Sequence, residues 1–267
     1  MHKKHLLPVF FILLLSCKKT EDTTTPKAVP NCYVTSVRDE FKDITANINY
    51  DKQGKISGII RRQGTFQLEK DTVIYSGNKI IVNATPYNYS EYVKSTWTLN
   101  GTSQVTNLST YDIYSKRSSD YSFEYNDDGY LIKFISGVFQ YDVTYDAGNP
   151  IKITSKRTDF NNTPEISYEM EYYADKLNLE QPNFQKSPIL FNFLDEGNFG
   201  FFSGDIWFIY NLGKKSKNLI KTLKRYNSGG FLGSTFNFTF EVDGDKLKRR
   251  LMTGSASDNS TFTYKCE

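Results

Sequence analysis

Apolar and polar residues alternate along most of the chain from Asn31 onward, and short turn-forming stretches interrupt the alternation. A seven-residue pattern recurs at these interruptions: Tyr, Asp or Asn, two variable positions, Gly or Asn, one variable position, then Ile or Leu. Its copies begin at Tyr50, Tyr125, Tyr145 and Tyr226. Strands with one apolar face produce such alternation, so the pattern predicts a series of β-hairpins.

The Asx and glycine positions of the repeated pattern have a reason in turn geometry. The Asx side chain can accept a hydrogen bond from a backbone N–H two residues on, which starts a turn. The fifth position holds Gly54, Gly129, Gly230 or Asn149, and Gly and Asn reach positive φ at the lowest cost. A hairpin loop of four or five residues needs such a residue where the chain enters the next strand.

A second class of turn is tighter and consists of a small residue followed by Asx. It occurs at Gly77–Asn78, Ala174–Asp175 and Gly244–Asp245, and Asn100–Gly101 adds one more hairpin signal. So many hairpins leave little of the chain for other structure. We therefore predict an all-β fold, a long antiparallel meander forming a strongly curved or barrel-like sheet, in a single domain over residues 31–267.

The alternation breaks down between Glu180 and Trp207. Ser187 and Pro188 suit the N-cap and first position of a helix, so we expect one short helix over residues 187–196. The aromatic residues that follow are candidates for a ligand-binding surface. They are Phe199, Phe201, Phe202 and Trp207. The alternative is a helix that only covers an open face or end of the sheet.

The first sixteen residues have the features of a secretory signal peptide, a basic end followed by a short apolar run. The segment Leu14–Cys17 resembles a bacterial lipobox, whose cysteine becomes the lipidated N-terminus. The alternative is an ordinary signal peptide with a chance cysteine. Residues 17–30 are polar and lack apolar periodicity, which predicts a flexible tether. We expect an outer-membrane lipoprotein, either periplasmic or exposed at the cell surface.

Charge and histidine content exclude several functions. The 33 basic residues outnumber the 30 acidic ones, but Lys3 and Lys4 belong to the leader, so the excess nearly vanishes without it. Nothing therefore favours nucleic acid as a partner. Both histidines, His2 and His5, also lie in the leader. Without histidine, a Ser-His-Asp or Cys-His catalytic unit and a histidine-ligated metal site are excluded, and we predict no cofactor.

Two further cysteines, Cys32 and Cys266, lie near the ends of the predicted domain. In an oxidising envelope they are expected to form a disulfide, although two free thiols are the alternative. A bond between them would place the first and last strands side by side. Such a bond suits a sheet that curls toward closure, because closure removes exposed edge strands.

Two other features have a functional and a structural interpretation. Six aromatic residues in the strand-rich part could form a carbohydrate-stacking platform, or they could be the large members of cross-strand pairs, which is more common. They are Trp97, Tyr111, Tyr114, Phe134, Phe139 and Tyr141. The basic segment Gly213–Leu219 does not fit a phosphate-binding loop. We expect it to be a solvated connection, with contact to an anionic surface as the alternative.

Taken together, the lipobox, the tether, the Tyr-Asx hairpins and the segment Gly213–Leu219 resemble a family of uncharacterised Bacteroidetes lipoproteins with a porin-like fold. The resemblance implies a curved antiparallel sheet or barrel-like β-structure and no particular activity. A transmembrane barrel is not expected, because the strands lack a sustained outward apolar band.

The functional hypothesis from sequence is a non-enzymatic, lipid-anchored cell-envelope protein that binds a glycan, a peptide or a partner protein. One alternative is a glycoside hydrolase working through carboxylates, with Asp195 and Glu196, or Asp205, as candidates. The first two are adjacent and therefore point apart, which makes them a poor acid/base pair. Another alternative is a structural subunit of an outer-membrane assembly.

Overall fold

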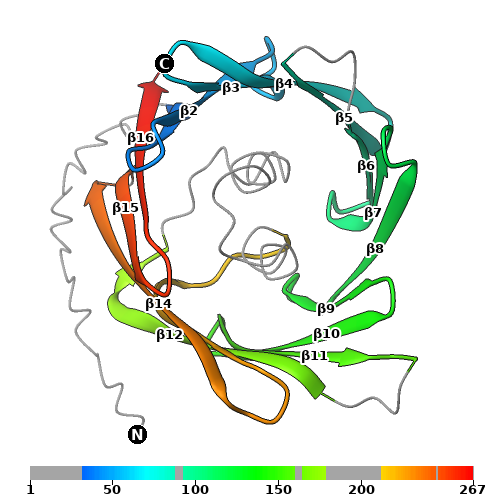
Figure 1. The fold of residues 1–267 in the computed structure, drawn as a ribbon, viewed down its shortest axis with the longest axis vertical. Coiled ribbons are helices and arrows are strands. Elements are labelled where there is room, and N and C mark those ends of the chain that lie inside the picture. The colour runs from blue at the N-terminus through cyan, green and yellow to red at the C-terminus, as the bar shows by residue number, and fades with distance from the viewer. Residues whose placement is uncertain (1–31, 88–92, 160–163, 179–211, 245, 267) are drawn as a thin grey trace, which may run out of the picture. The chain divides into compact units, whose positions relative to one another are not determined.

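The computed structural model describes residues 32–87, 93–159, 164–178, 212–244 and 246–266. These residues form sixteen strands in one closed antiparallel barrel (Figure 1). Each strand pairs with the strands before and after it in sequence, and the first pairs with the last. The predicted all-β meander with a barrel-like sheet is therefore confirmed. No helix among the described residues is long and apolar enough to cross a membrane.

The strands follow one another in quick succession, with one long connection after the twelfth. They are β1 (Cys32–Asp39), β2 (Ile44–Tyr50), β3 (Ile56–Gln63), β4 (Phe66–Ser76), β5 (Lys79–Pro86), β6 (Val93–Leu99), β7 (Val105–Asp112), β8 (Arg117–Tyr125), β9 (Leu131–Ser136), β10 (Phe139–Asp146), β11 (Asn149–Arg157), β12 (Pro164–Leu177), β13 (Asn218–Tyr226), β14 (Leu232–Asp243), β15 (Lys246–Gly254) and β16 (Asp258–Cys266). The predicted helix at 187–196 lies outside the described residues.

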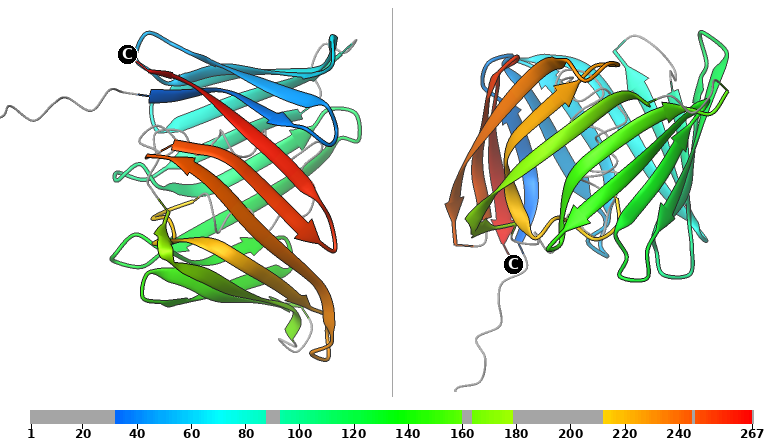
Figure 2. Two further views of the ribbon diagram at one scale, coloured as in Figure 1. Left: turned by 90° about the vertical axis from the view of Figure 1, so that its left-hand side faces the viewer. Right: turned by 90° about the horizontal axis from the view of Figure 1, so that it is seen from below.

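The barrel has two distinct mouths. Because consecutive strands are antiparallel, every odd-numbered strand begins at the same end, and the side views in Figure 2 show the strands tilted between the two ends. We call the end with Cys32 and Cys266 the terminal mouth. It carries, among others, the turns 51–55, 100–104 and 126–130. The other end is the distal mouth.

The inner face of the barrel is mostly apolar, with a few buried charged residues such as Arg61 and Asp71. On β2, the buried residues Ile44, Ala46 and Ile48 alternate with Thr45 and Asn47, which are only partly buried. Buried apolar residues from strands all around the ring belong to one continuous cluster. Side chains from opposite walls of a closed ring can meet only on its inner side, so this cluster marks the inner face.

The outer face is polar and carries cross-strand ion pairs. These pairs are Glu124–Lys133 (2.7 Å), Asp142–Lys156 (3.3 Å), Glu171–Lys224 (2.8 Å) and Glu241–Arg249 (3.2 Å). Exposed pairs of this kind add little stability individually. They show, however, that the outer wall presents charge to its surroundings over β8 to β15.

Three copies of the repeated pattern form the expected turns. The glycine in the fifth position has positive φ in each, 74° at Gly54, 87° at Gly129 and 80° at Gly230. The turn at Asn100 is built in the same way, with Ser103 (φ 64°) in the place of the glycine. These hairpins are confirmed.

The prediction for Asn149 was wrong. The chain turns at Ala147 (φ 46°) and Gly148 (φ 84°), and Asn149 already pairs with Asp146 as the first residue of β11. A two-residue loop with positive φ at both positions matches the twist of the strands, so no further left-handed residue is needed. The Asn149 side chain instead accepts a hydrogen bond from the Asn218 N–H (2.8 Å).

The prediction of a tight turn at Ala174–Asp175 was also wrong. These residues lie inside β12, which continues to Leu177 and pairs there with Asn218. A hairpin needs a strand directly after the turn, whereas the next partner of β12 is β13. The residues after Tyr172 are accommodated by a shift in register. The turn at Gly77–Asn78 is confirmed by the flanking pair formed by Ser76 and Lys79 in the ladder.

The predicted disulfide is confirmed. Cys32 and Cys266 are bonded across 234 residues of sequence and form the first aligned pair of the β1–β16 ladder. The bond therefore joins the two strands that close the ring. Every strand of the closed barrel lies between these two cysteines.

Candidate functional site

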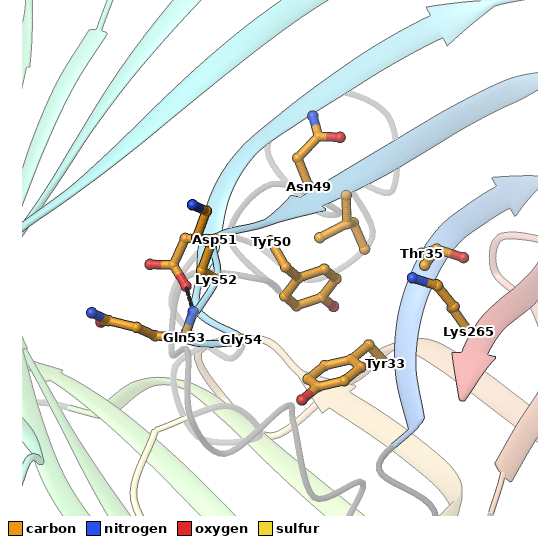
Figure 3. Close-up of a pocket in the computed structure, with 10 residues that line it drawn as sticks. Tyr33, Thr35, Asn49, Tyr50, Asp51, Lys52, Gln53, Gly54 and Lys265 are labelled. Carbon is orange, nitrogen blue, oxygen red and sulfur yellow. Dashed lines mark hydrogen bonds between the residues drawn. The ribbon is translucent and has the colours of Figure 1, made fainter. Parts of the chain in front are cut away.

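A groove opens in the barrel wall at the terminal mouth, where β1 and β2 diverge. Their ladder runs only from the pair Asp39–Ile44 to the pair Ser36–Asn47. Beyond it, the Tyr50 hydroxyl donates a hydrogen bond to the carbonyl of Val34 (2.7 Å) and so joins the separated strands through a side chain. The hollow between the strands and the 51–55 turn has a volume of about 530 Å³ (Figure 3). We call it the Tyr33 groove.

Two tyrosine rings dominate the groove. Tyr33 and Tyr50 lie with their ring centroids 5.2 Å apart and their planes tilted (Figure 3). Burial raises the pKa of Tyr50 well above its ordinary value, and the nearby Tyr33 and Tyr75 add to the shift. Tyr50 therefore stays protonated at neutral pH and can act as a hydrogen-bond donor. Gly54 packs against Tyr33, because a Cβ added there would lie 3.1 Å from the Tyr33 hydroxyl.

The charge of the groove is mainly positive. Lys52 and Lys265 are exposed at its edge. The carboxylate of Asp51 accepts hydrogen bonds from the backbone N–H groups of Gln53 (2.8 Å) and Lys55 (2.9 Å), so it serves the turn. A ligand would therefore meet two cations and one carboxylate that is already engaged.

Uncharged polar groups complete the lining. Thr35, Asn49 and Gln53 contribute a hydroxyl and two amides. Aromatic surface combined with a few hydrogen-bonding groups is typical of binding sites rather than of reactive centres. Among the described residues, no three His, Cys, Asp or Glu side chains lie close enough together to hold a metal ion. Among the described residues that line the groove, Asp51 carries the one carboxylate.

Most of the site residues expected from sequence lie outside the described residues. They are the lipidation candidate Cys17, the aromatic candidates Phe199, Phe201, Phe202 and Trp207, and the acidic candidates Asp195, Glu196 and Asp205. These assignments stay predictions. Cys32 and Cys266 form the disulfide already described.

The six aromatic residues of the strand-rich part do not form one platform. Trp97 and Phe134 are fully buried, and Phe134 stacks on Tyr141, its partner in the ladder, at 4.3 Å. Tyr111 and Tyr114 are exposed at the distal mouth. The interpretation as large members of cross-strand pairs is therefore confirmed for Phe134 and Tyr141.

The basic segment Gly213–Leu219 is a connection whose residues Gly213, Lys214 and Lys217 are exposed, as expected of a solvated connection, and its backbone is docked at the terminal mouth. The Lys214 N–H donates to the carbonyl of Gly129 (2.7 Å), and the Lys217 N–H donates to that of Gly148 (3.0 Å). The Lys214 ammonium lies 4.8 Å from the centroid of the Tyr130 ring. The charges of the lysines gave no indication that the backbone of this segment also bonds two turns.

Sequence reasoning also missed the Tyr33 groove. The groove depends on where the β1–β2 ladder ends, and the sequence of neither strand alone determines that position. One signal was available. Tyr50 belongs to the repeated pattern, and turn geometry gives no reason for a tyrosine at its first position.

Comparison with known proteins gives a likeness of fold. No protein-family model and no curated protein match the chain. A solved structure of a porin-like protein from Bacteroides uniformis is similar, with 17% sequence identity and a TM-score of 0.57 over 87% of this chain and 96% of the other. A porin-like protein from Bacteroides vulgatus has 14% identity and a TM-score of 0.52, over 86% and 98% of the two chains. The chain therefore has the porin-like fold that the resemblance implied.

Proposed function

We propose that this chain is a lipid-anchored, non-enzymatic protein of the cell envelope that binds a glycan, a peptide or a partner protein in the Tyr33 groove. The observation that carries the proposal is the combination of a polar outer wall with a single-carboxylate groove in a barrel closed by a disulfide. A rigid scaffold that presents such a groove is suited to recognition.

The polar wall supports a position outside the hydrocarbon of the bilayer. Transmembrane barrels turn an apolar band toward lipid, and charges near the middle of that band are costly. Here the pairs Glu124–Lys133 and Glu171–Lys224 lie on the outer face. Attachment through Cys17 would then hold the protein at the membrane, since several acyl chains on one residue give stable anchoring. The porin-like Bacteroides structures support an envelope location through their fold.

The groove supports binding over catalysis. Hydrolysis of a glycoside by carboxylates needs two of them facing each other across the substrate. The described lining of the Tyr33 groove offers one carboxylate, Asp51, whose oxygen accepts two backbone hydrogen bonds of the turn. Its tyrosines, amides and lysines can hold a ligand without reacting with it.

The anchoring part is tested by a Cys17→Ala substitution in the full-length chain expressed in a Bacteroides host. We expect the wild-type protein in the membrane fraction and the variant in the soluble fraction. Retention of the variant in the membrane fraction would contradict lipid anchoring at this cysteine.

The binding part is tested with a protein of residues 18–267 screened on arrays of glycans and peptides. A ligand of either class whose binding is weakened by Tyr33→Ala supports the proposal. A parallel Trp207→Ala variant tests the aromatic candidate from the sequence. Absence of ligands, or ligands unaffected by Tyr33→Ala, would contradict binding in the Tyr33 groove.

A further inference from the structure

The turn beside the Tyr33 groove has a structural copy at the same mouth. In the turns 51–55 and 126–130, a tyrosine hydroxyl bonds the carbonyl of a valine on the preceding strand, Tyr50 to Val34 (2.7 Å) and Tyr125 to Val105 (2.8 Å). Both turns are closed by a hydrogen bond from the glycine N–H to the Asx carbonyl, at 3.1 and 2.9 Å. The two turns are therefore the same unit in two places, and Gly54 corresponds to Gly129.

The chain itself occupies the second copy. Gly213 forms an isolated antiparallel bridge with Tyr130, and the Lys214 N–H donates to the Gly129 carbonyl (2.7 Å). Gly213 fits closely, since an added Cβ would lie 2.7 Å from both the Gly129 carbonyl oxygen and the Tyr125 ring. This turn unit therefore holds a backbone segment whose glycine has a positive φ (72°) and lies against the tyrosine ring.

In the first copy, the described part of the chain places no backbone segment in the position that Gly213 and Lys214 take in the second. Among the described residues, none donates a hydrogen bond to the Gly54 carbonyl. The hollow of the Tyr33 groove lies beside this turn, and Figure 3 shows the Tyr33 and Tyr50 rings next to each other between the two diverging strands. The backbone of a bound peptide can thus add the hydrogen bond that Lys214 supplies in the other copy.

The two copies differ in charge. The second copy has Tyr130, and the Lys214 ammonium lies over its ring. The first copy has Lys55 at that position, with Lys52 and Lys265 at the edge of the groove. A lysine of the ligand would face like charges there, whereas an acidic side chain would be attracted.

We infer that the Tyr33 groove binds a peptide segment of another protein, with a glycine of positive φ against Tyr50 and acidic side chains after it. The N–H that follows the glycine donates to the Gly54 carbonyl. The inference rests on the proposed binding role of this groove and names the class of its ligand.

The probe is a fluorescent peptide Leu-Gly-Glu-Glu-Ser-Glu, which is the sequence of residues 212–217 with its lysines replaced by glutamates. Fluorescence anisotropy with residues 18–267 measures its binding. We expect the original sequence Leu-Gly-Lys-Lys-Ser-Lys to bind roughly tenfold or more weakly because of charge repulsion. We expect a similar loss when valine replaces the glycine. Equal binding of the three peptides, or no binding of the acidic one, would overturn the inference.

Charge reversal in the protein sharpens the test. The double variant Lys52→Glu with Lys265→Glu is expected to prefer the lysine peptide. Lys70→Glu with Lys94→Glu is the matched control, since both residues are exposed strand positions and the change in net charge is the same. The control should keep the preference for the acidic peptide. The same preference in both variants would overturn the inference.

Two outcomes separate this inference from the proposed function. A glycan that binds the wild-type protein and is weakened by Tyr33→Ala, without any binding of the acidic peptide, would overturn the peptide class and leave the binding function standing. A protein of residues 32–267 that binds the acidic peptide roughly tenfold more tightly than residues 18–267 would identify residues 18–31 as the occupant. That result would overturn binding of a segment from another protein.

Discussion

At the scale of single residues, several tyrosines of the terminal mouth join neighbouring strands through hydrogen bonds from their hydroxyl groups. Where the backbone ladder of an odd and the following even strand stops, a tyrosine hydroxyl on the even strand bonds a carbonyl near the start of the odd strand. The pairs are Tyr50–Val34, Tyr125–Val105, Tyr145–Leu131, Tyr172–Pro150 and Tyr264–Leu247, at 2.7 to 3.0 Å. This role explains the tyrosine in three copies of the repeated pattern, Tyr50, Tyr125 and Tyr145, for which turn geometry gave no reason.

Removal of one of these tyrosine–carbonyl hydrogen bonds should lower the stability measurably. We expect Tyr125→Phe to lower the free energy of unfolding by about 1–2 kcal/mol, because the carbonyl of Val105 loses its donor in a largely buried place. Urea denaturation followed by circular dichroism gives the value. Tyr111→Phe is the control, since Tyr111 is exposed on the outer face, and it should change little. An equal effect of both substitutions would contradict the stabilising role of the Tyr125 hydroxyl.

The same tyrosines predict a loss of stability in alkali. Burial raises the pKa of Tyr50, Tyr125 and Tyr145 in the folded protein. Above about pH 10 the unfolded chain releases these protons while the folded protein retains them, so unfolding is favoured as pH rises. The stabilising contribution is complete below about pH 10 and is lost as pH rises through the folded values. Denaturation midpoints at increasing pH, with tyrosinate absorbance alongside, test this. A midpoint unchanged across that range would contradict it.

At the scale of elements, one connection is held by the turns of other hairpins. After β12, the chain returns at Leu212 and runs along the terminal mouth to β13. Leu212 itself is buried in the core cluster. The backbone of Lys214 and Lys217 bonds the turns before β9 and β11. This docking positions the start of β13, which enters the ladder at Asn218 with the Asn149 side chain bonded to its N–H (2.8 Å).

A glycine substitution isolates this docking. In Gly213→Ala, the new Cβ would meet the Gly129 carbonyl and the Tyr125 ring at 2.7 Å, so the segment must shift. Gly137→Ala is the matched control, since Gly137 also has positive φ but open space around it. Both variants carry backbone strain of about 1 kcal/mol. We expect only Gly213→Ala to speed amide hydrogen exchange at Lys214 and Lys217. Equal exchange in the two variants would count against the tight fit.

The hairpins could be predicted from sequence because their determinants are local. Asx and glycine at fixed spacing specify the turns at Gly54, Gly129 and Gly230 without knowledge of partners. The failures at Asn149 and Ala174 arose where another element decides the outcome. The Asn149 side chain accepts a hydrogen bond from the Asn218 N–H, and Ala174 lies in a strand that pairs with β13.

The candidate site could not be predicted in the same way. The Tyr33 groove exists because β1 and β2 separate beyond Ser36, and that register depends on how the whole ring closes. The aromatic content of the strands was visible in the sequence. Which tyrosines face a hollow and which face the core depends on strand pairing, so Tyr33 could not be distinguished from Tyr141.

At the scale of the whole molecule, the ring is closed twice at one seam, by the β1–β16 ladder and by the disulfide. The disulfide spans 234 residues, and the chain-entropy model assigns a loop of this size about 4–5 kcal/mol, as an upper figure. A barrel without exposed edge strands also avoids edge-to-edge association.

The double variant Cys32→Ser with Cys266→Ser tests the contribution of the bond. We expect the free energy of unfolding to fall by about 2–5 kcal/mol. Amide exchange should increase first in β1 and β16, because the ladder there begins at the two cysteines. Denaturation of the wild-type protein with and without reductant gives an independent value. An unchanged midpoint in both experiments would show that the backbone ladder alone closes the ring.

The position of the disulfide also decides how the barrel responds to mechanical load. Without the disulfide, a force on the chain before Cys32 would separate β1 from its neighbours one backbone hydrogen bond at a time, starting at its first residue. A β-ladder resists force least in this direction. With Cys32 bonded to Cys266, the same force passes through a covalent bond into β16 and is shared by the strands on both sides of the seam. The barrel of a protein tethered at this end would therefore resist unfolding when force acts on the tether.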